Sequence, residues 1–304
     1  MTTAVLLAVY SCLILTASLV GGWIPLWIRL THTRLQVATS FVAGLMLGVG
    51  FLHLLPHSWQ QLQDIDLTMR WVFGGFVAMF FIQRFFHFHH HDVPEESPEV
   101  VLEHLHSHEC KHHHEPATLA EKSAHHLSWA GAAAGLTIHT LIDGITLAAS
   151  VRAESGVGTT LAGLGVFLVI ILHKPFDAMT IGTLMAAGGW PRGRRHLVNV
   201  LFATAIPVGV MLFTLGINPL EPQSGLFLGA ALAFAAGSFF CIAASDLLPE
   251  LQFHAHDRVK LSLSLLAGIG LAVLVGKLEH DGHHQNQKTG QIQKANSPGN
   301  KAPF

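Results

Sequence analysis

The sequence predicts an all-α polytopic membrane protein with eight transmembrane helices. Of its 304 residues, 50% are hydrophobic and only 12% are charged, whereas a soluble globular protein carries about 25% charged residues. Apolar runs of roughly 20 residues recur along the chain, and a helix of that length crosses a bilayer. The formal net charge of −2 favours neither nucleic acid nor an acidic substrate as a partner. We therefore expect the lipid bilayer to surround this chain.

The eight apolar segments are separated by polar stretches. In chain order they lie near 4–28, 37–55, 71–86, 127–151, 158–185, 197–215, 226–248 and 261–276. The first has no charge before it and is followed by Arg29 and Arg34, which is typical of a membrane span rather than of a cleaved signal peptide. Residues 1–86 thus hold helices 1–3, and residues 127–276 hold helices 4–8. A loop at 87–126 separates the two groups, and a polar tail at 277–304 is expected to be mostly disordered.

The basic residues predict the orientation of these spans. If the N-terminus lies outside, the outer loops hold only Arg70 and Arg152. Ten basic residues then lie in or beside the inner loops: Arg29, Arg34, Arg84, Lys111, Lys122, Arg192, Arg194, Arg195, Arg258 and Lys260. Cytoplasmic loops carry an excess of Lys and Arg, so we expect both termini outside. With no targeting feature, the sequence favours a prokaryotic inner membrane.

The loop at 87–126 is rich in histidine. It holds twelve of the 23 histidines, mixed with glutamates. Such a low-complexity segment cannot bury a core, so we expect it to be disordered and cytoplasmic. An engineered tag is the alternative, although tags are usually terminal and contiguous. The loop is interpreted as a weak, multisite metal-binding segment through His104, His106, His108, His112, His113 and His114.

Two His-x-x-x-Asp steps lie inside the fourth and fifth apolar segments. His139 and Asp143 form the first step, and His173 and Asp177 form the second. Positions i and i+4 share one face of a helix, and the short connection makes the two spans antiparallel neighbours. Two imidazoles and two carboxylates match one divalent cation such as Zn²⁺, while the lack of thiolates disfavours Cu(I) and the nitrogen content disfavours Ca²⁺ and Mg²⁺. The alternative is a buried His–Asp hydrogen bond on each helix.

Three neighbours of these ligands modify the prediction. Pro175 removes a backbone hydrogen bond, so we expect broken helix geometry beside the site. Lys174 points about 100° away from His173 on a helix, and its ammonium could lie beside the carboxylates where a second cation would otherwise bind. Together with Thr140, it is a candidate modulator of the site, and it predicts a single-metal centre.

Two further polar clusters lie at the predicted membrane edges. His53 and His57 end the second span on the outer side, and a stripe of Asp246, Glu250 and His254 lies at the inner end of the seventh. These residues are candidate entrance and exit stations for an ion. Polar residues are also expected at membrane boundaries without any such role.

These motifs resemble the ZIP (Zrt/Irt-like) family of metal-ion transporters. Members typically carry His-Asn-x-x-(Asp/Glu)-Gly in the fourth span, where this chain has His139-Thr140-Leu141-Ile142-Asp143-Gly144. The fifth-span motif begins with His and an acid or amide, where this chain has His173-Lys174-Pro175-Phe176-Asp177. The segments His53-Leu54-Leu55-Pro56 and Leu247-Leu248-Pro249-Glu250 and the histidine-rich loop are also similar to the family.

The resemblance implies a ZIP-like bundle of eight helices that transports zinc or a related divalent ion toward the cytoplasm. By motif position, His139, Asp143, His173 and Asp177 would be the ligands. Thr140 and Lys174 depart from the family pattern at positions that belong to a second metal, and Pro175 comes one residue early. A two-metal centre is therefore doubtful on this ground as well.

Other functions remain open from the sequence. A cation diffusion facilitator would export metal, but that class resembles a six-span protein with a soluble C-terminal domain. An intramembrane zinc hydrolase would use the same ligands, but its zinc usually keeps three protein ligands and an open position. A metal sensor built around the loop would not need ligands at mid-membrane. The sequence predicts a transporter rather than an enzyme, and it leaves open Zn²⁺, Fe²⁺, Mn²⁺, Cd²⁺ or Ni²⁺ as the ion and whether the protein is a homodimer.

Overall fold

The computed structural model describes residues 2–23, 32–86, 119–155, 161–216, 224–247 and 258–295. Within these ranges it confirms the all-α class. Eight helical stretches are long and apolar enough to cross a membrane: Thr3–Gly21, Thr33–Leu62, Ile65–Arg84, Ala130–Ser155, Leu164–Ala186, Arg192–Gly216, Ser224–Ser245 and Arg258–Lys277.

Several spans are built from more than one helical segment. The described elements are α1 (Thr3–Gly21), α3 (His32–Val49), η1 (Gly50–Leu54), α4 (Leu55–Leu62), α5 (Ile65–Phe86), α7 (Leu119–Ser155), α8 (Leu164–Ala187), α9 (Arg192–Ala203), α10 (Ala205–Gly216), α11 (Ser224–Ile242), η2 (Ala243–Leu247) and α13 (Arg258–Ala295). Here η marks a π-helical turn. The second span combines α3, η1 and α4, the sixth combines α9 and α10, and the seventh combines α11 and η2.

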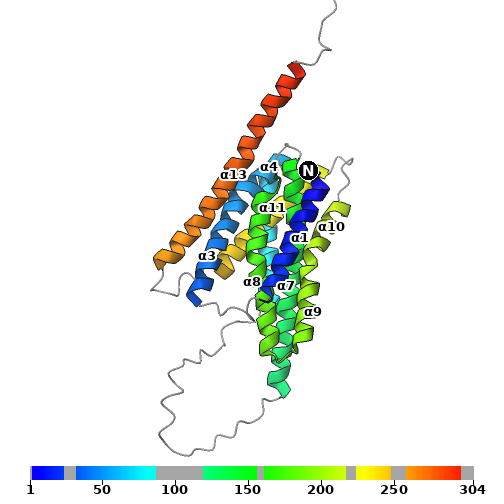
Figure 1. The fold of residues 1–304 in the computed structure, drawn as a ribbon, viewed down its shortest axis with the longest axis vertical. Helices are drawn as coiled ribbons and strands as arrows, with labels where there is room; N and C mark the ends of the chain where they lie inside the picture. Colours follow the sequence, from blue (N-terminus) through cyan, green and yellow to red (C-terminus); the bar gives the residue numbers. More distant parts are fainter. Residues whose placement is uncertain are drawn as a thin grey trace, which may run out of the picture.

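Successive spans run in opposite directions through one bundle (Figure 1). The start of α1 and the end of α13 lie at the same end of the bundle, which we call the terminal side. The end of α5 and the start of α7 lie at the opposite end, which we call the loop side. An even number of crossings places both ends of the chain on one side.

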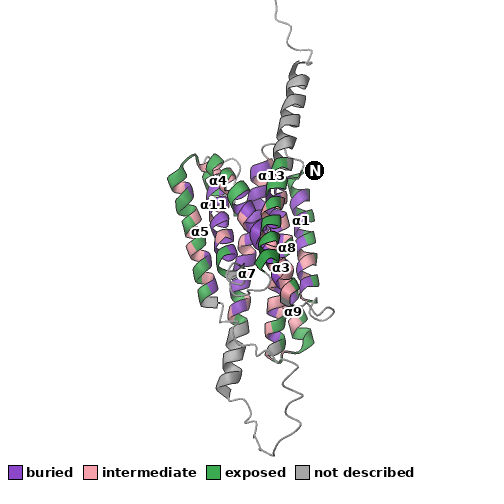
Figure 2. Cartoon of the chain, turned by 90° about the vertical axis from the view of Figure 1, so that its left-hand side faces the viewer, coloured by how far each residue is buried: buried purple, intermediate pink, exposed green. Residues whose placement is uncertain are grey.

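Buried residues concentrate along the middle of the bundle, and exposed ones cover its outer surface (Figure 2). Ile14, Leu147 and Ile170 are fully buried. By contrast, 69% of Phe73 and 80% of Leu215 are exposed. Because a bilayer is as apolar as these side chains, such outward residues are expected on a membrane protein.

The helices pack in pairs that are distant in sequence: α3 with α13, α5 with α11, α7 with α10 and α1 with α8. Between α7 and α10 the contact depends on two glycines. Gly144 faces the backbone carbonyl of Ile206, and Gly209 faces the carbonyl of Leu141, with no room for a Cβ at either glycine. Such close backbone approach is how small residues join helices in lipid. It holds the segment just after Asp143 firmly against α10.

Several helix boundaries differ from the prediction. The helix of the third span begins at Ile65 rather than near 71, and α7 begins at Leu119, inside the predicted loop. Helix α13 continues to Ala295, through most of the tail that was expected to be mostly disordered. Apolarity marks only the part of a helix that lies in the membrane, whereas helix formers such as Lys, Gln and Ala extend it into polar surroundings. The next proline after the eighth span is Pro298, beyond the end of α13.

The irregular backbone also lies elsewhere than predicted. Helix α8 runs without interruption through Pro175, so the expected break at this proline is not found. The π-helical turns lie instead within the second span, at η1, and at the end of the seventh span, at η2. π-Helical turns are rare in proteins as a whole, and those that occur are often found at functional sites. The sequence does not predict them.

Candidate metal centre

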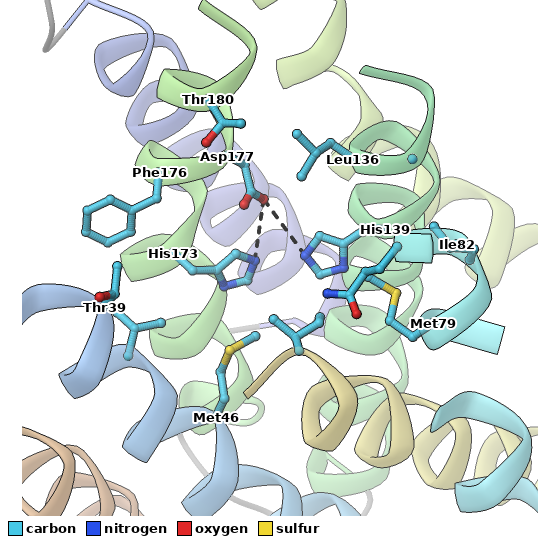
Figure 3. Close-up of a pocket in the computed structure, with 14 residues that line it drawn as sticks. Thr39, Met46, Met79, Ile82, Leu136, His139, His173, Phe176, Asp177 and Thr180 are labelled. Atoms are coloured by element: carbon cyan, nitrogen blue, oxygen red, sulfur yellow. Dashed lines mark ion pairs between the residues drawn. The ribbon is translucent and has the colours of Figure 1, made fainter. Parts of the chain in front are cut away.

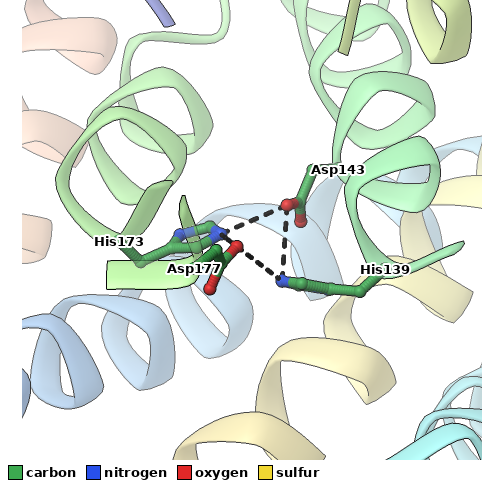
Figure 4. Close-up of side chains that lie close together, drawn as sticks. All are labelled: His139, Asp143, His173 and Asp177. Carbon is green, nitrogen blue, oxygen red and sulfur yellow. Dashed lines mark hydrogen bonds and ion pairs between the residues drawn. The ribbon is translucent and has the colours of Figure 1, made fainter. Parts of the chain in front are cut away.

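The four predicted ligands come together in the middle of the bundle (Figure 4). His139 and Asp143 lie on α7, and His173 and Asp177 lie on the adjacent α8. One ligand atom from each residue lies within 4.8 Å of all the others. The i, i+4 spacing on two neighbouring antiparallel helices produces this meeting point.

The distances between the ligand atoms suit a small cation. Asp143 Oδ2 lies 3.4 Å from His139 Nε2 and 3.1 Å from His173 Nε2. Asp177 Oδ2 lies 3.8 Å from each of the same two nitrogens. Tetrahedral zinc with bonds of about 2.1 Å separates its ligand atoms by about 3.4 Å. The group could therefore hold such an ion with small side-chain shifts.

The hydrogen bond of His173 determines which of its ring nitrogens faces the centre without a proton. Nδ1 donates to the backbone carbonyl of Val169 at 2.8 Å, because a carbonyl oxygen can only accept. In the neutral ring, Nε2 then presents its lone pair to Asp143 Oδ2, 3.1 Å away. Two facing lone pairs are stabilised by a cation between them. A backbone carbonyl behind a histidine is also the usual way that a metal ligand is oriented.

The four residues are nearly closed off from the surface. Asp143 is fully buried, and His139 and His173 are 4% and 6% exposed. The side chain of Asp177 is the most open, at 15%. Asp143 Oδ1 has no hydrogen-bond partner among the described residues. An unpartnered buried carboxylate oxygen is costly, which is a further sign that this group is built to receive a cation.

Lys174 lies against both carboxylates of the group. Its ammonium donates to Asp143 Oδ2 at 2.8 Å, to Asp177 Oδ2 at 3.0 Å and to Thr140 Oγ1 at 2.9 Å. It is fully buried and lies 5.5 Å from the centre of the Phe202 ring. Thr140 can accept this bond because its own hydroxyl donates to the carbonyl of Leu136. Two carboxylates thus share one permanent positive charge.

A cavity of about 180 Å³ leads from the ligands toward the loop side (Figure 3). From α7 the cavity is lined by Gly135 and Leu136, which precede His139. From α8 it is lined by Phe176 and by Thr180, which follows Asp177. The other helices contribute the residues Thr39, Val42, Met46, Met79, Ile82, Gln83 and Ile242. Toward the terminal side, Thr146, Leu147 and Ile170 are fully buried. The cavity beside the centre therefore extends toward the loop side, whereas the residues toward the terminal side are closely packed.

The candidate entrance histidines lie apart from this group. His53, in η1, is 3% exposed and donates from Nε2 to the carbonyl of Ala272 at 2.9 Å. His57, in α4, lies 4.0 Å from the carboxylate of Glu154. Both belong to the closed terminal side, so His53 does not face an open entrance in this conformation.

The remaining predicted positions lie outside the described side chains. Asp246 is in η2 at the loop side, but its side chain is not described. Outside the described residues altogether lie Glu250, His254, His104, His106, His108, His112, His113 and His114.

Sequence reasoning missed Glu154. This residue is 2% exposed, accepts a hydrogen bond from the Ser150 hydroxyl at 2.9 Å and accepts another from the Gly163 N–H at 2.6 Å. It joins the end of α7 to the start of α8. A carboxylate just after residue 151, the predicted end of the fourth span, was the sequence signal that could have identified it. Met79 and Gln83 were missed too, because a cavity lining and a packed core share the same residue types.

Eight spans around a buried group of two histidines and two aspartates define a polytopic membrane protein suited to a divalent cation. Residues 3–276 match the family model described as ZIP zinc transporter, so the chain belongs to the ZIP family. This match confirms the resemblance to the ZIP family and decides against a cation diffusion facilitator. Because members of the ZIP family are transporters rather than enzymes, it also decides against a zinc hydrolase.

Curated relatives agree with this assignment. The chain is 24% identical to "Zinc transporter ZIP9-A" of Xenopus laevis, over 83% of this chain and 87% of the relative. It is 23% identical to "Zinc transporter 3" of Arabidopsis thaliana, over 79% and 73% of the two chains. A third relative, "Fe(2+) transport protein 2" of Arabidopsis thaliana, is 24% identical over 77% and 74%. These relatives are eukaryotic and lend no support to the predicted prokaryotic inner membrane.

Proposed function

We propose that this protein carries a divalent cation, in the first place Zn²⁺, across the membrane toward the cytoplasm. His139, Asp143, His173 and Asp177 would bind the ion in transit. The observation that carries the proposal is that one ligand atom from each of these residues lies within 4.8 Å of all the others, while Asp143 Oδ1 has no hydrogen-bond partner among the described residues. A buried group of nitrogen and oxygen ligands of this kind is stabilised by a cation.

The direction rests on the cavity and on the charges. The cavity joins the ligands to the loop side while the terminal side is closed. Among the described residues, Arg34, Arg84, Arg192, Arg194, Arg195, Arg258 and Lys260 lie at or near the loop side. We infer from this excess of positive charge that the loop side is cytoplasmic and that both termini lie outside. The described conformation is then the one that releases the ion inward.

The centre is proposed to bind one ion at a time. In the resemblance to the ZIP family, Thr140 and Lys174 stand at positions that belong to a second metal. The Lys174 ammonium lies within 3.0 Å of both carboxylates, where a second dication would have to compete with a permanent charge. A one-ion site follows.

Other divalent ions remain candidates for the same site. Imidazole and carboxylate ligands also accept Fe²⁺, Mn²⁺, Cd²⁺ and Ni²⁺, and a relative named for Fe²⁺ transport supports a broader range. We keep His53 and His57 as proposed entrance residues, and Asp246, Glu250 and His254 as proposed exit residues. The histidines of the loop would bind ions weakly after their release, and a homodimer remains a proposal without further support.

Flux into proteoliposomes tests the function. Purified wild-type protein should pass Zn²⁺ down its gradient, and Asp143→Ala and His173→Ala should each abolish the flux. Asp64→Asn is the matched control, because Asp64 is exposed between α4 and α5 on the terminal side, and asparagine keeps the side-chain oxygen that accepts from the backbone N–H groups of Asp66 and Leu67. It should leave the flux intact. Undiminished flux in both centre variants would refute the assignment of the site.

A further inference from the structure

A small cavity lies where α1, α8 and α9 meet at the loop side of the bundle (Figure 1). It measures about 50 Å³, and none of the four metal ligands lines it. We propose that this cavity binds the headgroup of an anionic phospholipid that also carries a hydroxyl group, such as phosphatidylglycerol. The place of this lipid in the cytoplasmic leaflet rests on the proposed orientation of the protein, whereas the binding itself does not.

Two buried polar atoms of the cavity lining have no hydrogen-bond partner among the described residues: Arg195 Nε and Asn199 Oδ1. Asn199 is 7% exposed, and its Nδ2 donates to the carbonyl of Leu19 at 3.3 Å, so only its oxygen is unpaired. The two residues lie one turn apart on the same face of α9. An unpaired buried donor or acceptor destabilises a protein unless another group pairs with it. A ligand that offers both an acceptor and a donor would pair both atoms.

The surroundings of Arg195 favour an anion as the acceptor. The indole N–H of Trp23 donates to His196 Nδ1 at 3.3 Å, so the neutral imidazole carries its proton on Nε2 and can donate as well. Arg195 lies in the first turn of α9, where the helix dipole favours negative charge. No described residue that lines the cavity is acidic. A guanidinium group binds a phosphate through two parallel N–H bonds, so a phosphate is the anion that fits this place best.

The position favours a lipid over a soluble anion. Arg192 and Arg194 are exposed at the start of α9, and basic clusters at the cytoplasmic end of a membrane helix attract anionic lipids. Leu197 and Leu201 are exposed in the next turns of the same helix. Exposed leucines in a membrane span face acyl chains. Residues suited to a headgroup and residues suited to its chains therefore adjoin on one helix.

The size and depth of the cavity predict how the headgroup lies. About 50 Å³ admits one small polar group rather than a complete headgroup. Arg195 is partly exposed, so we expect it to meet the phosphate at the mouth of the cavity. The headgroup hydroxyl would lie inside and donate to Asn199 Oδ1. Gly22 provides the space for this amide, since a Cβ at Gly22 would overlap it.

Lipid binding by the purified full-length protein tests the proposal. Native mass spectrometry in detergent measures Kd for phosphatidylglycerol, phosphatidylmethanol and phosphatidylcholine. Phosphatidylmethanol has the same charge as phosphatidylglycerol but no headgroup hydroxyl, and phosphatidylcholine is zwitterionic. We expect phosphatidylglycerol to bind most tightly. Phosphatidylmethanol should bind several-fold more weakly, and phosphatidylcholine about tenfold more weakly or worse.

Three variants locate the binding. Arg195→Gln should weaken the binding of phosphatidylglycerol about tenfold, because it removes the guanidinium. Arg192→Gln is the matched control: it makes the same change of charge at an exposed position of α9 that does not line the cavity. It should change Kd less than about twofold, since exposed charges contribute little. Gly182→Ala fills part of the cavity without changing the charge, and its added Cβ would lie 3.8 Å from the nearest atom, the Gly22 oxygen. It should weaken the binding several-fold.

Three outcomes would overturn the proposal. Equal losses in Arg195→Gln and Arg192→Gln would show a general attraction to positive charge. A Kd that Gly182→Ala leaves unchanged would place the lipid outside the cavity. Equal Kd values for phosphatidylglycerol and phosphatidylcholine would remove the role of the anion.

Inorganic phosphate separates a lipid from a soluble anion. It should not displace phosphatidylglycerol from the wild-type protein. If inorganic phosphate bound in a manner that depends on Arg195 while phosphatidylglycerol did not bind, the cavity would be a site for soluble anions and the lipid proposal would be wrong. None of these measurements uses Zn²⁺ flux, so a failure of the proposed transport function and a failure of the lipid site are distinguishable.

Discussion

The ammonium of Lys174 lies 2.8 Å from Asp143 Oδ2, the same oxygen that lies 3.1 Å from His173 Nε2. One buried carboxylate oxygen is therefore shared between a cation that belongs to the chain and the place where a transported cation would bind. Coulomb repulsion between the two cations is strong at such distances in a dry interior. The lysine thus weakens the binding of the ion as well as limiting the number bound, and both effects favour release.

We expect a single tightly bound ion in the membrane core of the wild-type protein. Lys174→Glu removes the ammonium and adds a carboxylate at the position of the second metal, so two ions should bind. Elemental analysis of purified protein without the 87–118 segment would measure this. Deleting the segment removes the histidine-rich stretch that could add ions of its own, and it leaves α7 complete. Two tightly bound ions in the wild-type core would refute the one-ion site.

The pair of Lys174 and Asp143 also predicts a stability effect. Asp143→Asn leaves the buried ammonium with one carboxylate instead of two, and breaking a buried ion pair costs about 3–5 kcal/mol. The melting temperature in detergent should fall. Adding Lys174→Met should restore much of the loss, because the unpaired charge is then gone. If the double variant melted lower than Asp143→Asn, the two residues would not be coupled in this way.

The sequence predicted the four central residues because i, i+4 spacing is a local property of a helix. The contacts of the Lys174 side chain were harder to predict. The helical wheel turns its Cα about 100° from His173, yet its long side chain reaches back to both carboxylates. Residue Glu154 was missed because apolarity ended the fourth span at 151, before the helix itself ends at Ser155.

Contacts between distant helices could not be predicted. The hydrogen bonds of Gln83 with Cys241 and Ser245 join α5 to the seventh span across about 160 positions of the sequence, and no local period of either helix encodes that pairing. The same holds for the contact of Gly144 with α10. The π-helical turns have no signal in the pattern of apolar residues, and the predicted break at Pro175 was wrong because a proline inside a membrane helix can be accommodated by its neighbours.

The shape of the cavity predicts on which side the centre can be reached. In a chain with its cysteines replaced by serine, Thr180→Cys should react with a water-soluble maleimide added at the cytoplasmic side, since Thr180 lines the cavity and is partly exposed. Ser150→Cys should not react, because Ser150 is 1% exposed on the closed side. Labelling of inside-out and right-side-out vesicles separates the two faces. Reaction of Thr180→Cys from the outer face alone would reverse the proposed direction.

The contact between α7 and α10 predicts opposite effects for two glycine substitutions. At Gly144, an added Cβ would overlap the carbonyl oxygen of Ile206, which is backbone and cannot move aside alone. Gly144→Ala should therefore separate the helices and lower the free energy of unfolding by about 1–3 kcal/mol or more.

The matched control is Gly74→Ala on α5, where nothing lies within 4 Å of an added Cβ. Alanine is the better helix former by about 1 kcal/mol, so Gly74→Ala should raise the melting temperature slightly while Gly144→Ala lowers it. The loss of Zn²⁺ flux should follow the melting temperature, because Gly144 directly follows Asp143. Equal melting temperatures for the two variants would show that α7 and α10 do not pack through this glycine.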